Sequence, residues 1–186
     1  MRHGQTIFNV RRKVQGWCDS PLTELGIKQA ETAAKYFKDN NISFDRAYSS
    51  TSERACDTLE IVTDMSYSRL KGLKEWNFGT FEGESEDLNP ALPYGDFFAN
   101  YGGEKEKEKE FQKRIVDTVQ NIVEEDNEVF LIVSHGAACR KFMQYWEHTS
   151  PITQKERISN CCILKFEYEN KEFKLVEIIN HDFSNL

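Results

Sequence analysis

The sequence predicts an α/β fold, a three-layer sandwich in which a mostly parallel central sheet is flanked by helices. Segments with strand-like composition alternate with segments of helical spacing, which is typical of such a sheet. Residues 129–133 form a continuous apolar run that suits a buried parallel strand. With 186 residues, 39% of them hydrophobic, the chain can bury the core of one domain, which we expect to span residues 1–186.

The first half of the chain is expected to contain two helices around a short strand. Thr23 precedes a run of apolar residues at helical spacing, and Asn40 and Asn41 end it. An extended segment follows around residues 44–48, and a second run of helical spacing begins near residue 53. The strand therefore leads into a helix start, where backbone N–H groups favour anions.

The second half is expected to begin with a strand, followed by a long lid or substrate loop at about residues 82–104. A helix runs through residues 111–122, and its alternating charges are interpreted as a solvated start. The apolar strand at 129–133 then passes into another helix through Ser134, His135 and Gly136. The last segments alternate as two antiparallel strands joined by a turn near Asn170.

The composition argues against several classes of partner. The formal charge of −7 makes the surface repel nucleic acid and anionic lipid on average, so an anion would need a local basic pocket. The chain has no apolar run of about eighteen residues, so we expect no membrane span. The five cysteines form no CxxC pair and follow no signal-like segment, so we expect buried thiols in a reduced, cytoplasmic protein.

Basic residues stand at three expected strand-to-helix exits. Arg2 and His3 lie near the start, Arg54 opens the second helix, and His135 follows the apolar strand. In this class of fold, ligands bind beyond the carboxyl ends of the strands. Arginine binds phosphate oxygens two at a time. If the three exits share one edge of the sheet, they form a phosphate site that needs no metal.

Such a site also requires a proton donor, and Glu75 is the candidate. It lies among Leu73, Trp76 and Phe78. An apolar environment pushes a carboxyl group toward its protonated form, which a general acid needs. Glu82, a few residues further on, is the alternative.

Five segments resemble the histidine phosphatase superfamily, also called the phosphoglycerate mutase-like family, in its bacterial broad-specificity phosphatase branch. They are RHGQTIFN, QGWCDSPLTELGIKQA, YSSTSERACDT, LKEWNFGTFEG and VSHGAA, in the family's order from residue 2 to about 140. The resemblance implies a phosphatase that uses neither metal nor cofactor and acts on a small phosphorylated metabolite.

The resemblance also implies a role for each matching residue. His3 would be the nucleophile that takes the phosphoryl group, and Glu75 would protonate the departing alcohol and later activate water. Arg2, Arg54 and His135 would hold the phosphate oxygens, with His135 counted among the catalytic residues. The other residues expected to bind substrate are Gly4, Gln5, Thr6, Asn9, Gln15, Gly16 and Gly136.

Two other functions are compatible with this sequence. A mutase of the same fold would need a clamp for a second phosphate, and no arginine or lysine lies between Lys74 and Lys105. A non-catalytic phosphate-binding or interaction domain would form no covalent phosphohistidine. We therefore expect hydrolysis of phosphomonoesters.

The resemblance places an apolar strand of about five residues before Arg2, and only Met1 precedes Arg2 here. Such a strand would bury about three or four apolar side chains at roughly 1.5–3 kcal/mol each. We therefore expect that the first strand is truncated and that the functional polypeptide starts several residues upstream.

Overall fold

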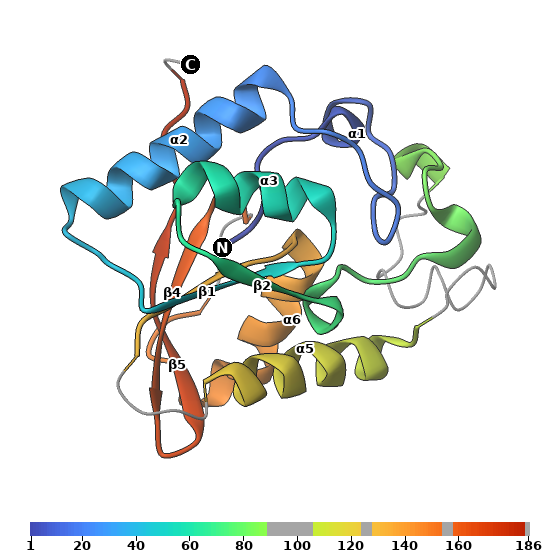
Figure 1. Ribbon diagram of the computed structural model, residues 1–186. Coiled ribbons are helices and arrows are strands. Elements are labelled where there is room, and N and C mark those ends of the chain that lie inside the picture. Colours follow the sequence, from blue (N-terminus) through green and yellow to red (C-terminus); the bar gives the residue numbers. More distant parts are fainter. Residues whose placement is uncertain (89–105, 124–127, 154–157, 185–186) are drawn as a thin grey trace.

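A three-stranded parallel sheet lies at the centre of the molecule (Figure 1). Its strands follow the order β2 (Tyr67–Leu70), β1 (Arg46–Ser50) and β3 (Phe130–Val133). The computed structural model describes residues 1–88, 106–123, 128–153 and 158–184. Most of the lid expected at about 82–104 lies outside these residues. The parallel pairing confirms the predicted fold class.

Helices cover both faces of this sheet, as Figure 1 shows. α2 (Glu24–Asp39) and α3 (Glu53–Val62) lie on one face, and α5 (Glu108–Ile122) and α6 (Gly136–Tyr145) lie on the other. No helix within the described residues has the length and apolar character needed to cross a membrane. The other helical elements among the described residues are α1 (Ile7–Val10), η1 (Lys71–Leu73), η2 (Gly79–Phe81), η3 (Glu86–Leu88) and η4 (Glu147–Thr149).

Alternation along the strands separates two hydrophobic cores. Ala47 and Leu131 pack with residues of α2 and α3, whereas Tyr48 packs with residues of α5 and α6. On the second side, Phe111 stacks against Trp76 with ring centroids 5.5 Å apart. This contact holds the segment after η1 against α5.

A hairpin of β4 (Ile163–Glu169) and β5 (Glu172–Ile179) forms a second, antiparallel sheet. Its turn contains Asn170 and Lys171, whose φ angles are 54° and 64°. Two successive left-handed residues suit a tight hairpin turn between twisted strands. The antiparallel pair and its turn were both predicted from the sequence.

Residues 1–3 lie between the two sheets. Arg2 forms a parallel bridge with Ser134, directly after β3, and its N–H donates to the carbonyl of Cys162, directly before β4. The N–H of His3 donates to Ser134, and its carbonyl accepts from the N–H of Cys161. The backbone of His3 is therefore fixed from both sides at the carboxyl edge of the parallel sheet.

The chain after His3 packs against the start of α2 through two glycines. A Cβ on Gly4 would lie 2.5 Å from the carbonyl oxygen of Gly26, and a Cβ on Gly26 would lie 2.1 Å from the carbonyl oxygen of Gln5. Both neighbours are backbone atoms, so neither can rotate away. The loop therefore reaches its position only because both residues lack side chains.

Gly26→Ala is expected to destabilise the protein, although alanine favours a helix over glycine by about 1 kcal/mol. Overpacking typically costs about 1–3 kcal/mol, and a contact with backbone this close belongs at or above the upper end. Urea unfolding measures the change, with Lys28→Ala, at an exposed position of α2, as the control. A Gly26→Ala variant as stable as the control would contradict this, because it would show that the backbone near Gly26 can shift at little cost.

Candidate functional site

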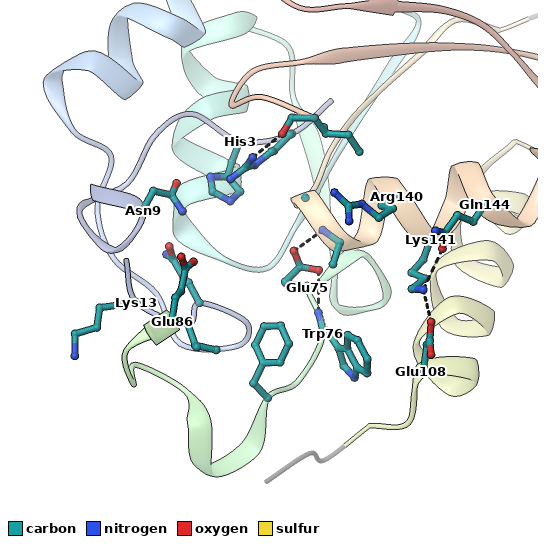
Figure 2. Close-up of a pocket in the computed structure, with 17 residues that line it drawn as sticks. His3, Asn9, Lys13, Glu75, Trp76, Glu86, Glu108, Arg140, Lys141 and Gln144 are labelled. Atoms are coloured by element: carbon teal, nitrogen blue, oxygen red, sulfur yellow. Dashed lines mark hydrogen bonds and ion pairs between the residues drawn. The ribbon is translucent and has the colours of Figure 1, made fainter. Parts of the chain in front are cut away.

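A cavity of about 500 Å³ opens at the carboxyl edge of the parallel sheet. His3 and Asn9 line one side, and Glu75 and α6 line the other (Figure 2). The residues predicted from the sequence that line this cavity are Arg2, His3, Asn9, Gln15, Glu75 and Gly136. Within the described parts of the chain, no group of three or more His, Cys, Asp and Glu side chains could hold a metal ion.

His3 is held in one tautomer. Its Nδ1 lies 2.7 Å from the carbonyl oxygen of Gly4, and because a carbonyl can only accept, Nδ1 carries the proton. Nε2 therefore bears the lone pair, and it accepts a bond from Nε of Arg54 at 3.3 Å. Burial, reinforced by the charges of Arg54 and Arg2, lowers the pKa of His3 well below its usual value. The ring is thus a neutral base at neutral pH.

Arg54 lies behind His3 and is completely buried. Its guanidinium group donates to two carbonyls of the loop at residues 16–18 and pairs with Asp19 at 2.8 Å. The same Asp19 carboxylate accepts the N–H of Glu53, the first residue of α3. The sequence indicated that the N–H groups at the start of α3 would favour an anion, and the carboxylate of Asp19 is the anion found there.

His135 lies beside His3, with ring centroids 5.3 Å apart, and is completely buried. Its Nε2 lies 2.7 Å from Oγ of Ser50, and its Nδ1 has no hydrogen-bond partner within the described part of the chain. Burial and the neighbouring positive charges lower its pKa well below the usual value. A buried polar atom without a partner is uncommon, which makes Nδ1 a candidate contact for a ligand atom.

Glu75 lies across the cavity from His3 at the start of α6 (Figure 2). Its Oε1 accepts the N–H groups of Trp76 and Ala138, and its Oε2 accepts that of Ala137. Burial raises the pKa of Glu75, and the N–H groups of Ala137 and Trp76 oppose that rise. Oε1 accepts two of these bonds and Oε2 accepts one. Oε2 is therefore the oxygen that can carry a proton and donate it to a ligand.

Glu82, the alternative proton donor, has a different function in the structure. Its carboxylate accepts the N–H groups of residues 16–18 and of Phe78, and it does not line the cavity. It shapes the loop whose carbonyls hold Arg54. The geometry therefore favours Glu75 as the candidate acid.

Asn9 presents a defined end of its amide to the cavity. Its Oδ1 accepts the N–H of Thr6 and a bond from the side chain of Asn160. Asn160 also donates to the carbonyl of His3. With its oxygen engaged, Asn9 retains its NH₂ group for a ligand.

Six residues expected to bind substrate do not line the cavity: Gly4, Gln5, Thr6, Gly16, Arg54 and His135. Gln5 accepts a bond from the hydroxyl group that caps α2, and Thr6 donates to Gln15 at 2.7 Å. Thr6 also caps α1, where its hydroxyl accepts the N–H of residue 9. The side chains of Gln5 and Thr6 therefore support the loop and do not line the cavity.

Several lining residues were missed in the sequence, and most belong to α6 or to the segments opposite it. They are Lys13, Val14, Trp76, Phe78, Glu86, Glu108, Ala137, Arg140, Lys141, Gln144 and Ile158. Trp76 and Phe78 were noted only as apolar neighbours of Glu75. Helical spacing from Gly136 would have indicated Arg140 and Gln144, which follow at one and two turns.

Arg114 of α5 fastens the segment that carries Glu75. It donates to the carbonyls of Gly72, Lys74 and Glu75 at 2.7, 2.9 and 3.1 Å, and its Nε and Nη2 each donate to one carboxylate oxygen of Glu106. The side chain of Glu106 is only 14% exposed. The charged segment before α5 is therefore partly structural, contrary to the expectation of a solvated start.

Arg114→Met is expected to lower the free energy of unfolding by about 3–5 kcal/mol, because it leaves the largely buried Glu106 without its partner and three carbonyls without a donor. Lys113→Met is the matched control, since the neighbouring Lys113 forms an exposed ion pair with Asp117. That change should stay within about 0.5 kcal/mol. Urea unfolding that gave equal, small losses for both variants would contradict the fastening role.

Comparison with known proteins gives a consistent result. A family model described as the histidine phosphatase superfamily (branch 1) matches residues 1–181. A broad-specificity phosphatase of Saccharomyces cerevisiae is 30% identical over 190 residues, covering 93% of this chain and 80% of that protein. The structure of Bacillus stearothermophilus YhfR aligns with a TM-score of 0.80 and 29% identity, over 94% of this chain and 92% of that one. A phosphoserine phosphatase of Entamoeba histolytica, in complex with 3-phosphoglyceric acid, aligns with a TM-score of 0.77 and 28% identity, over 97% and 94%.

Proposed function

Because this chain belongs to the histidine phosphatase superfamily, we propose that it hydrolyses phosphomonoesters of small metabolites through a phosphohistidine formed on His3. The observation that carries the proposal is the state of His3. Its ring is neutral, its Nδ1 is tied to Gly4, and its Nε2 has a lone pair beside Arg54. The cavity of about 500 Å³ suits a small phosphorylated metabolite.

In the first half of the proposed reaction, the lone pair of His3 Nε2 forms a bond to phosphorus, and the bond from phosphorus to the ester oxygen breaks. Glu75 gives its proton to that oxygen as the alcohol departs. Arg54 exchanges its bond with Nε2 for a phosphoryl oxygen, and Arg2 and His135 bind the others. These donors stabilise the charge on the phosphoryl oxygens as the group transfers.

In the second half, the Glu75 carboxylate takes a proton from a water molecule that attacks the phosphohistidine. The P–N bond breaks, its electron pair returns to Nε2, and inorganic phosphate leaves. Glu75 is then protonated and His3 neutral, as at the start. These residues complete the cycle without a cofactor.

Replacing His3 is expected to abolish turnover, because the remaining groups bind phosphate but cannot form the covalent intermediate. His3→Ala and His3→Asn should each reduce the release of inorganic phosphate by at least about 10³-fold. Thermal melting identifies variants that keep the fold. A folded variant of either type that still releases phosphate at more than a small fraction of the original rate would contradict the proposal.

Glu75→Gln is expected to slow hydrolysis of alkyl phosphates by about 10²- to 10⁴-fold, the usual contribution of a general acid. Aryl phosphates should lose much less, because their leaving groups depart without a proton. The kcat/KM values of both substrate classes provide the comparison. Equal losses for the two classes would assign Glu75 a structural role.

The dependence of kcat/KM on pH should reflect the two shifted groups of the free enzyme. His3 must be neutral, and since its pKa is lowered, activity should persist below pH 6.5 and fall only at lower pH. Glu75 must be protonated, and since its pKa is raised, its form as an acid should persist above pH 4.5. After correction for ionisation of the substrate, an acidic limb at or above pH 6.5 would contradict the assignment of His3.

A further inference from the structure

Arg140 lines the same cavity as His3 and Glu75 but takes part in none of the contacts described above. It is an exposed residue of α6, and within the described residues no hydrogen bond or ion pair engages its guanidinium group. A charged side chain that borders a cavity in this way can bind a ligand without first giving up a partner.

The helix directs Arg140 toward the place where the alcohol part of a substrate would lie. Position 140 follows Gly136 by one turn, or about 6 Å along the axis. Side chains on a helix lean toward its N-terminus, which here is the end that holds Glu75. Figure 2 shows the guanidinium group of Arg140 extending from α6 toward the space between His3 and Glu75.

The other positively charged side chains that line the cavity lie elsewhere in it or already bind a carboxylate. Arg2 donates to the carbonyl of Ile158 and lies beside His3. Lys141 binds Glu108 and Gln144. In Figure 2 the side chain of Lys13 is directed away from Arg140, on the far side of the cavity.

The positions of Glu86 and Glu108 also favour a negative group of a ligand beside Arg140. Glu108 is paired with Lys141, so its charge is offset. Glu86 lies on the side of Asn9, across the cavity from Arg140 (Figure 2). A negative group on a ligand is therefore favoured beside Arg140 and disfavoured beside Glu86.

We propose that Arg140 binds a carboxylate on the alcohol part of the substrate and thereby determines specificity. The proposal rests on the phosphatase function proposed above. The planar guanidinium fork matches a carboxylate through two parallel hydrogen bonds. The segment between Lys74 and Lys105 contains no such cation, so the second anion site comes from α6. The preferred substrates are short phosphomonoesters that carry a carboxylate near the ester oxygen.

The test compares 3-phosphoglycerate with glycerol 3-phosphate, which carries a hydroxymethyl group in place of the carboxylate. The measured quantity is the ratio of their kcat/KM values, from phosphate release. The original protein should prefer 3-phosphoglycerate. Arg140→Met should lower the ratio by about 10- to 100-fold, the range expected for a hydrogen-bonded charge pair, and Arg140→Lys should restore part of it. Lys141→Met, in which the removed charge is already paired, should leave the ratio unchanged.

The outcomes separate two claims, the role of Arg140 and the proposed hydrolysis. A ratio that Arg140→Met leaves unchanged, or an original protein that does not prefer the carboxylate, would overturn the role of Arg140. Equal losses on both substrates would also overturn it, because they would place Arg140 at the phosphoryl group or in the fold. If the original protein released phosphate from neither substrate nor from an aryl phosphate, the proposed hydrolysis itself would fail.

Discussion

The bond between His3 Nδ1 and the carbonyl of Gly4 is the contact on which the rest of the site depends. It decides which ring nitrogen carries the proton, and so which one faces Arg54. The carbonyl can hold its position because Gly4 and Gly26 pack backbone to backbone, and because the N–H of Gly4 donates to Thr58 of α3 at 3.0 Å. A loop that leaves the sheet edge is thus fixed by two helices on the same face.

Two carboxylates near His3 accept N–H groups at the starts of helices. Asp19 accepts an N–H at the start of α3 and pairs with Arg54, while Glu75 accepts N–H groups at the start of α6. A carboxylate is favoured at the positive end of a helix dipole. The two cases differ because Asp19 is already paired with a cation, whereas Glu75 is buried beside a cavity. Desolvation raises the pKa of Glu75 and so favours its protonated form.

Local patterns predicted much of the fold. The hydroxyl of Thr23 caps α2 and the hairpin turns at Asn170, both as expected. These features could be predicted because they depend on residues that are neighbours in the sequence. β1 lies about two residues later than expected, since its bounds are set by pairing with β2 and β3. The basic exits also converge as expected, because parallel strands share one carboxyl edge.

Other features required contacts between distant segments. Gln5 and Thr6 resemble ligands in the sequence, but the caps of α2 and α1 use their side chains. The sequence pattern predicts that Glu106 belongs to a solvated run of charges, yet Arg114 holds it against the segment before Glu75. Arg140 is unremarkable in sequence until the helix places it over the cavity.

The most direct test of this account is to trap the phosphorylated protein and determine which nitrogen of which histidine carries phosphorus. Rapid quenching at alkaline pH preserves phosphohistidine, and NMR spectroscopy of the labelled protein distinguishes substitution at Nε2 from substitution at Nδ1. The account predicts phosphorus on Nε2 of His3, because Nδ1 is committed to Gly4. Phosphorus on Nδ1 of His3, on His135, or on no histidine during turnover would contradict it.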